Sequence, residues 1–437
     1  EETLHFDPHL APTALSALAS SAVAEGLTIY SQDAREAVPG LAASWSRSDD
    51  GLVWIFTIRD NARFSDGTSI TARNFVESWL NLLSPNNPKA SYSSFLDNVK
   101  GAHAYRTGAG KASDVGIQAI DPSHLVVTLK YPAPYLDQLL ALPGFAAIHP
   151  AVLAGTVPPG TLSSGPFILA HQDEDGYTLI KNRWYYAAEE LGYETLRLDI
   201  RGPGTEVYED YKKGMIQWSQ VYIPEPWLVG GDVQMAPQYS TDFFYFSTSE
   251  GPYARPAVRQ ALLALLDIRT IRTLKPLIAT SSLVPFSTAR LTIPTGTQAE
   301  RKAKALDLLA AEGFADTALL PPITIAVHRG SQTQQTAEYI AETWSQELGI
   351  TVILDTVPLA VYATYPETSP YDIATLTWIG DFPSPQAFLS LWQSDSSYNL
   401  GKYTDSVFDS LMAQAYKSPE TERSRYLIQA EQHLLDQ

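Results

Sequence analysis

The chain has 437 residues, 45% of them hydrophobic and 18% charged, and a formal net charge of −18. This length predicts two or three domains, and the acidic balance argues against nucleic acid or an anionic membrane surface as the main partner. The absence of cysteine excludes disulfides, thiolate zinc sites and a cysteine nucleophile, and no apolar run approaches the roughly 18 residues that span a membrane.

The first residues carry no recognisable site. The chain starts at Glu1 rather than Met, so we expect a processed or trimmed N-terminus, with any export signal or lipid anchor outside this sequence. His5 and His9 have the spacing of helical metal ligands, but Pro8 breaks that geometry, and we predict no metal site. A helix over 14–27 and a short strand over 28–30 follow.

A strand, a turn and a helix come next. Apolar residues alternate along 52–59, which predicts a strand with one buried face. Thr71 is a candidate helix cap, and the helix over 72–83 gathers an apolar stripe on one side: Phe75, Val76, Trp79 and Leu83. Taken alone, this pattern predicts a β-meander packed under a helix, with no chemistry of its own.

The same stretch resembles the extracytoplasmic solute-binding proteins of the peptide/nickel class, which serve ABC importers. The resemblance rests on a long, evenly filled pattern: Trp45, Asp50-Gly51, Phe56, Arg59, Asn61-Ala62, Phe64-Ser65-Asp66-Gly67-Thr68, Thr71-Ala72, Phe75-Val76 and Trp79. It continues through nearly the whole chain, at Glu25-Gly26-Leu27, Ser164-Gly165-Pro166-Phe167, Lys181-Asn182, Val258-Arg259-Gln260-Ala261-Leu262, Gly313-Phe314 and Leu348-Gly349-Ile350.

The middle of the chain reads as short strands and helices. Asp173-Glu174-Asp175-Gly176 predicts a hairpin turn rather than a calcium loop, because its glycine comes too early. Gly108-Ala109-Gly110-Lys111 lacks the first glycine and the final Ser/Thr of a phosphate loop, so we treat it as a surface loop. The predicted elements are strands over 167–170, 177–181, 196–201 and 242–247, and helices over 206–213 and 256–274.

From residue 300 onward, helices and strands alternate. A helix over 301–312 is closed by Gly313. One βαβ unit follows, with strands over 323–327 and 350–354 and a helix over 334–348 between them. A mostly polar helical tail ends at Gln437.

One further strand, 373–379, ends in a distinctive way. Its residues are apolar or β-branched, and Gly380, Asp381 and two prolines stop it abruptly. The end of a buried strand in an α/β sheet is a common place for ligand groups. Trp378 and Asp381 offer an apolar face beside a carboxylate. On spacing alone, the pattern favours a core tryptophan followed by an aspartate in a turn.

The resemblance implies the fold and its division. We expect an α/β, two-lobed periplasmic-binding-protein-like fold with three subdomains (the cluster C type) and a ligand cleft between the lobes. Residues 1–25 and 148–239 would form lobe 1, 26–147 an extra subdomain attached to it, and 240–437 lobe 2. The family's usual C-terminal return to lobe 1 is absent after Gln437.

The resemblance also implies a ligand site. In oligopeptide-binding relatives the carboxylate closing the Trp-x-x-Asp motif holds the peptide's α-ammonium, and this motif is Trp378-Ile379-Gly380-Asp381 here. Backbone groups of Thr377 and Ile379 would pair with the peptide, Trp378 would stack beside a side chain, and Tyr92 would face the site from the opposing lobe. Thr375 stands where several relatives carry an arginine for the ligand's carboxylate, so how that end is held stays open.

These features predict a substrate-binding protein that captures short peptides for the membrane permease of an ABC importer. We expect a monomeric periplasmic or extracytoplasmic protein, with or without a lipid anchor, and no metal, cofactor or nucleic acid. Catalysis is not expected, because G-x-S-x-G, H-E-x-x-H, P-loop and dinucleotide motifs are all missing. The alternatives are a receptor for a nickel chelate, an oligosaccharide or another small solute, and, from other classes, a hydrolase or a surface adhesin.

Overall fold

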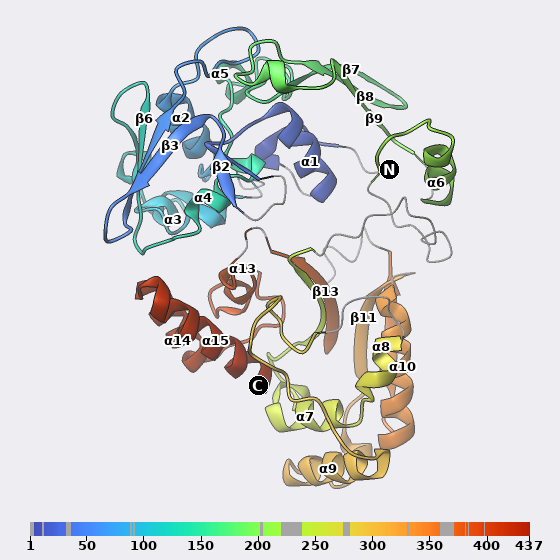
Figure 1. Ribbon diagram of the computed structural model, residues 1–437. Helices are drawn as coiled ribbons and strands as arrows, with labels where there is room; N and C mark the ends of the chain where they lie inside the picture. The colour runs from blue at the N-terminus through green and yellow to red at the C-terminus, as the bar shows by residue number, and fades with distance from the viewer. Residues whose placement is uncertain are drawn as a thin grey trace. The chain divides into compact units, whose positions relative to one another are not determined.

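The computed structural model describes residues 4–10, 13–31, 36–87, 90, 92–201, 204–219, 238–273, 280–329, 332–358, 371–380, 382, 384–396 and 398–437. The chain forms two compact units, Glu1–Pro237 (unit 1) and Gln238–Gln437 (unit 2), coloured from blue to green and from yellow to red in Figure 1. Both units mix helices with sheets, so the predicted α/β class is confirmed.

The described residues of unit 1 form three separate sheets. In the first sheet, β1 (Thr28–Tyr30) pairs antiparallel with β2 (Ala37–Pro39). The second sheet is antiparallel and contains, in spatial order, β3 (Ala42–Arg47), β4 (Val53–Ile58), β6 (His124–Thr128) and β5 (Ile117–Ala119). The third is also antiparallel, with β7 (Phe167–Asp173), β8 (Gly176–Lys181) and β9 (Thr195–Asp199) in that order. The predicted strand over 52–59 is β4, and Trp54, Phe56 and Ile58 line its buried face. The predicted hairpin joins β7 to β8.

The described part of unit 1 has three helices of 9 to 11 residues, α1 (Ala14–Val23), α2 (Ala72–Leu82) and α6 (Gly204–Lys212), and three shorter ones, α3 (Ala102–Arg106), α4 (Leu136–Leu139) and α5 (Pro150–Leu153). Helix α2 begins where Thr71 and Asn74 form a capping box, which satisfies backbone groups of the first turn. Phe75 and Trp79 are fully buried, and the Trp79 indole donates to the Phe145 carbonyl at 2.9 Å. The predicted helix and its cap are therefore confirmed.

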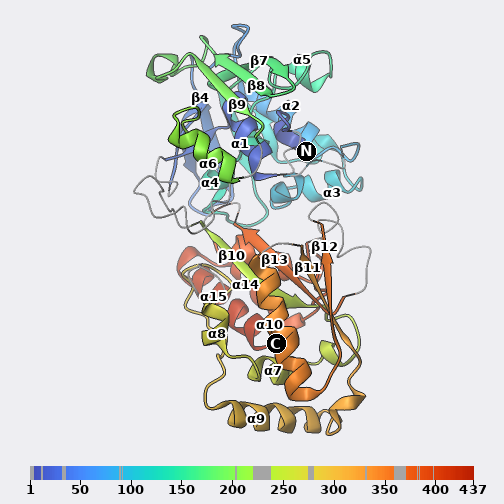
Figure 2. The same ribbon diagram turned by 90° about the vertical axis from the view of Figure 1, so that its right-hand side faces the viewer.

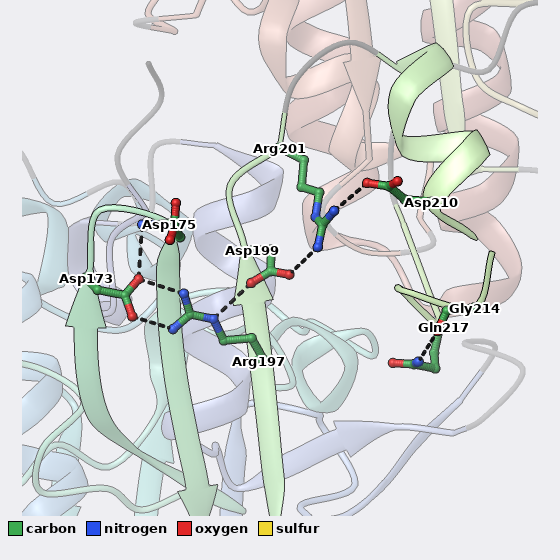
Figure 3. Close-up of polar contacts among 8 residues, drawn as sticks. All are labelled: Asp173, Asp175, Arg197, Asp199, Arg201, Asp210, Gly214 and Gln217. Atoms are coloured by element: carbon green, nitrogen blue, oxygen red, sulfur yellow. Dashed lines mark hydrogen bonds and ion pairs between the residues drawn. The ribbon is translucent and has the colours of Figure 1, made fainter. Parts of the chain in front are cut away.

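A ladder of alternating charges ties β7, β9 and α6 together (Figure 3). The Arg197 guanidinium donates hydrogen bonds to both carboxylate oxygens of Asp173, at 2.9 and 2.6 Å, and to Asp199 at 2.9 Å. Arg201 bridges onward, from Asp199 at 2.9 Å to Asp210 of α6. Each arginine thus serves two carboxylates, so α6 is held to the edge strand of this sheet by ion pairs.

Unit 2 is organised around one mixed sheet. Its strands, in spatial order, are β10 (Ser240–Phe246), β13 (Ile373–Ile379), β11 (Ile323–His328) and β12 (Val352–Val357). The β10 and β13 strands are antiparallel, whereas β11 runs parallel to both β12 and β13. Helix α10 (Gln332–Leu348) connects β11 to β12, which confirms the predicted βαβ unit.

Helices cover both sides of this sheet. Helix α10 lies along β11 and β12 in Figures 1 and 2, and α14 (Ser406–Lys417) and α15 (Glu420–Asp436) lie on the other side. Trp344 of α10 is buried and donates to the Leu262 carbonyl at 2.9 Å. The remaining helices are α7 (Pro256–Ala264), α8 (Ile268–Thr273), α9 (Gln298–Ala311) and α13 (Gln386–Leu389).

One predicted helix was wrong in length. The helix expected over 256–274 is two helices, α7 and α8, separated at residues 265–267. The Asp267 side chain accepts a hydrogen bond from the Arg269 backbone at 2.9 Å, as a cap at the start of a new helix does. The apolar stripe continues through Leu265 and Leu266, so the sequence period gave no sign of this break.

Within the described part of the chain, no helix is both long enough and apolar enough to cross a membrane.

Candidate functional site

Strand β13 has a different neighbouring strand on each edge, and one of these neighbours pairs with only the first part of β13. On one edge it pairs with β10 over its whole length, from Ile373↔Phe246 to Ile379↔Ser240. On the other edge β11 pairs with it only at Ile373 and Ala374. Among the described residues, no strand continues along this second edge of β13 beyond Ala374.

The register decides which backbone groups face that open edge. The Gly380 N–H donates to the Tyr239 carbonyl at 2.7 Å, and the Ser247 N–H donates to the Asp372 carbonyl at 2.8 Å. Even-numbered residues are therefore the hydrogen-bonded partners of β10, because such pairs alternate along an antiparallel ladder. Thr377 and Ile379 therefore direct their backbone groups to the opposite edge. Their pairing with a peptide stays a prediction.

Burial changes along the same strand. Ile373, Ala374 and Thr375 are buried, whereas Thr377 is exposed and Ile379 is 45% exposed. The first half of β13 thus belongs to the core, and the second half emerges from it. Thr375, the position where several relatives would carry an arginine, lies in the buried half at 5% exposure.

Trp378 is fixed at its polar edge. Its indole N–H donates to the Ala387 carbonyl at 2.7 Å, and its ring meets that of Tyr398 edge to face, with centroids 5.8 Å apart. The side chain is half-buried. Because the indole N–H already has an acceptor, the remaining surface of this side chain is apolar ring. The stacking of Trp378 beside a ligand side chain stays a prediction.

Gly380 serves packing as well as the turn. A Cβ atom there would lie 2.6 Å from Tyr239 Cδ1 and 2.7 Å from Phe388 Cε2, which is closer than real contacts allow. The two rings meet edge to face at 5.1 Å. A glycine is therefore required for β13 to end against this aromatic pair, and its predicted contact with the ligand stays a prediction.

Burial shapes the ionisable groups near the strand. It raises the pKa of the Tyr239 hydroxyl, and the negative charge of Glu431 adds to that rise. Burial also raises the pKa of Asp372, which accepts a hydrogen bond from the Thr324 backbone at 2.8 Å. No cluster of three or more His, Asp or Glu side chains in the described ranges is arranged to hold a metal ion.

Two predicted site residues need separate mention. Asp381 lies outside the described residues. Tyr92 belongs to unit 1, where it is 8% exposed and its ring packs against Phe95 and Phe145 with centroids 6.0 Å apart. A Cβ on Gly144 would lie 2.2 Å from the Tyr92 ring, so that ring is closely surrounded. The proposed contact of Tyr92 with a ligand stays a prediction.

Sequence reasoning missed the aromatic partners of β13. The rings of Tyr239 and Phe388 pack closely against Gly380, and the ring of Tyr398 contacts Trp378. The aromatic run over 242–247 predicted a strand that starts after Tyr239, and it did not indicate which strand it would pair with. Tyr398 lies in a polar loop with no pattern around it, so no sequence signal pointed to it.

Comparison with known proteins places these features in a family. Residues 36–399 match the family model of bacterial extracellular solute-binding proteins, family 5. The periplasmic murein peptide-binding protein MppA of Escherichia coli is 29% identical over 420 residues, which are 90% of this chain and 76% of that protein. The periplasmic oligopeptide-binding protein OppA of Salmonella typhimurium is 28% identical over 458 residues, covering 99% of this chain and 83% of that protein.

Solved structures give the same result for the fold. The murein tripeptide-binding protein MppA of Escherichia coli matches with a TM-score of 0.85 and 25% identity, over 100% of this chain and 89% of that one. OppA of Haemophilus influenzae, in complex with the peptide RPPGFSPFR, matches with a TM-score of 0.84 and 23% identity, over 99% and 89% of the two chains.

Proposed function

Because the chain belongs to family 5 of the bacterial extracellular solute-binding proteins, we propose that it captures short peptides and delivers them to the membrane permease of an ABC importer. Its relatives include oligopeptide- and murein peptide-binding proteins. The protein acts by binding rather than by catalysis, and it works as a monomer outside the cytoplasm. A lipid anchor is one way in which it would be kept near the permease.

The observation that carries this proposal is the open edge of β13. Backbone N–H and C=O groups are common to every peptide, so a strand edge recognises peptides irrespective of their side chains. Thr377 and Ile379 present such groups just where β11 has left the strand. The indole of Trp378 lies between them in sequence and supplies apolar surface for one side chain of the ligand.

Asp381 is proposed to hold the α-ammonium of the peptide. The role comes from the Trp-x-x-Asp motif, in which this carboxylate directly follows Gly380. A charge-assisted hydrogen bond to an ammonium group contributes roughly 1.5–3 kcal/mol. The amine end of the peptide would then lie at the end of β13, and its backbone would run along the open edge.

We propose that the chain divides into two lobes and one extra subdomain. Residues 240–437 form lobe 2, which carries the strand edge, while residues 1–25 and 148–239 form lobe 1. Residues 26–147 form the extra subdomain. The boundary between the two compact units at Pro237 and Gln238 supports the start of lobe 2, and the separate sheets of unit 1 support a further division there.

Replacing Thr377 by proline tests the strand edge. Proline has no N–H, so one hydrogen bond to the ligand is lost, and we expect peptide affinity to fall up to about tenfold by calorimetry. Thr377→Ala removes the side chain and keeps the backbone N–H, so it should bind as the wild type does. A second measurement avoids any change to the protein: methylating successive backbone nitrogens of one peptide should weaken binding at particular positions. Equal affinity for all methylated forms would contradict pairing with β13.

Replacing Asp381 by asparagine tests the proposed hydrogen bond between this carboxylate and the α-ammonium of the peptide. The substitution keeps the shape and removes the charge, so we expect affinity for a peptide with a free amine to fall by about tenfold or more. Acetylating the peptide's amine should weaken binding to the wild type by a similar factor and should add little in the variant. If acetylation costs the two proteins equally, Asp381 does not hold the amine.

A further inference from the structure

Phe286 of unit 2 is exposed to solvent in a backbone conformation that does not favour it. Its side chain is 86% exposed, more than that of any other large apolar residue in the described part of the chain. Its φ is 64°, in the left-handed region that residues other than glycine avoid because Cβ crowds the backbone there. A large apolar residue thus occupies a position that suits glycine, and its ring gains no burial in return.

The turn around Phe286 accounts for this backbone conformation. The Ser287 N–H donates to the Val284 carbonyl at 3.2 Å, which closes a four-residue turn with Pro285 and Phe286 at its centre. Proline at the second position and a positive φ at the third are typical of a type II turn, which favours glycine at the third position. Strained backbone of this kind clusters at ligand-binding and switch positions. The side chain of Phe286 is therefore a candidate for a binding role.

Helix α15 holds this turn in place. The Glu431 carboxyl group is 1% exposed and accepts a hydrogen bond from the Val284 backbone at 2.8 Å. The Gln432 side chain bonds the Arg290 backbone twice, accepting from its N–H at 2.9 Å and donating to its carbonyl at 3.0 Å. Because the chain is fixed before and after the turn, Phe286 is presented on a rigid support. Such a support reduces the entropy that is lost when a side chain binds a ligand.

The turn lies near the end of β13. Helix α15, which carries Glu431, packs against α13, and the Phe388 ring of α13 lies against Gly380. The Tyr239 ring also lies against Gly380. Burial and, next, the charge of Glu431 raise the pKa of the Tyr239 hydroxyl, which places these two side chains near each other. Glu431 therefore links the turn that carries Phe286 to the aromatic rings at which β13 ends.

We propose that Phe286 contacts an apolar side chain near the amine end of the bound peptide. This inference rests on the proposed function, in which the amine end of the peptide lies at the end of β13. The exposed ring and the apolar side chain of the ligand both leave water when they meet. Peptides with a large apolar residue at this position bind more tightly than peptides with a small one. Phe286 is thus a specificity-determining residue, whereas pairing with the strand edge serves every peptide.

A positional series of peptides tests this contact. The series starts from tetra-alanine and replaces one alanine at a time by leucine, so every member keeps the same charged ends. We expect calorimetry to show about tenfold tighter binding when leucine occupies one position in the half that carries the amine. Phe286→Gly removes the ring, so it should bind that leucine peptide and tetra-alanine with equal affinity. Phe286→Asn should do the same, because asparagine tolerates the left-handed conformation without adding the flexibility of glycine.

Two controls separate a binding role from a structural one. Leu319 is 65% exposed and lies just before the start of β11, which runs parallel to β13, so it is on the side of the sheet away from the end of β13. Leu319→Ala should therefore keep the gain from leucine. The urea midpoint of Phe286→Gly should equal or exceed that of the wild type, because glycine adopts this backbone without strain.

The outcomes distinguish this inference from the proposed function. If the wild type binds the series without any gain from leucine, or if the gain persists in both Phe286 variants, peptides bind without this contact and the inference alone is overturned. A lower urea midpoint for Phe286→Gly would show that the ring serves the fold, which also overturns it. If no peptide of the series binds to the wild type, the proposed function fails and the inference fails with it.

Discussion

Glu25 is a carboxyl group buried inside unit 1. Its side chain is 6% exposed, and its Oε2 accepts a hydrogen bond from the Tyr185 hydroxyl at 2.5 Å. Its Oε1 has no hydrogen-bond partner among the described residues. Burial raises the pKa of Glu25 to about 7, and hydrogen bonds from Tyr185 and Tyr186 and the charge of Arg59 only partly offset that effect. The folded state therefore favours the protonated form of this residue.

This burial predicts a pH-dependent stability. Glu25 is protonated in the folded chain and ionised in the unfolded chain between about pH 4.5 and about pH 7, so the free energy of unfolding should fall as pH rises through that window. The loss reaches up to about 3 kcal/mol. Glu25→Gln should remove this part of the pH dependence in urea titrations, whereas Glu36→Gln, at an exposed position, should keep it. Parallel profiles for wild type and Glu25→Gln would contradict the assignment.

At the scale of the element, the charge ladder of Figure 3 explains how α6 is held. Val207 and Tyr208 of α6 are buried, and Arg201 reaches Asp210 from the end of β9. The bidentate hydrogen bonds from Arg197 lower the pKa of Asp173 to about 2. A carboxyl group with a lowered pKa stabilises the fold above its ordinary pKa, and this contribution is lost as pH falls toward 2.

Arg197→Gln tests the ladder. Without the guanidinium, the pKa of Asp173 should rise from about 2 toward its ordinary value of 3.8, measured by NMR titration of the carboxyl carbon. Arg201→Gln is the matched control: it should raise the pKa of Asp199 and leave that of Asp173 near its original value. An unchanged Asp173 titration in Arg197→Gln would show that the paired geometry does not persist in solution.

Strand β13 shows how far sequence patterns extend. Its existence and its end were predictable, because an apolar, β-branched run meets a glycine and two prolines. The open edge depends on where β11 stops pairing, which is set by residues about 50 positions earlier in the chain. The contact of Gly380 with Tyr239 and Phe388 likewise joins distant segments. Local patterns predict elements, whereas strand neighbours depend on non-local packing.

Other sites follow the same rule. The packing of β3 and β4 beside residues 134–137, some 80 positions later, is another example, since no spacing within either segment indicated it. The break between α7 and α8 was not predicted for a different reason, because Leu265 and Leu266 extend the apolar helical stripe across it. The family resemblance supplied what local patterns could not: the roles predicted for individual residues at the end of β13.

At the scale of the whole molecule, the strand edge of the proposed site lies in one compact unit. Unit 2 carries Thr377, Trp378 and Ile379, whereas unit 1 contains Tyr92, whose contact with a ligand stays a prediction. The net charge of −18 favours capture of ligands with a free amine over anionic ones. A peptide bound by its backbone and its ammonium group fits both this charge and the geometry of β13.

The central claim is that peptides with a free amine are the ligands, and native mass spectrometry tests it most directly. The purified protein would be unfolded to release any bound solute, refolded, incubated with a digest of mixed short peptides and recovered. We predict complexes whose added masses correspond to short peptides, and far fewer complexes when the same digest has been acetylated at its amines. Failure to retain any peptide, or equal retention of the acetylated digest, would contradict the account.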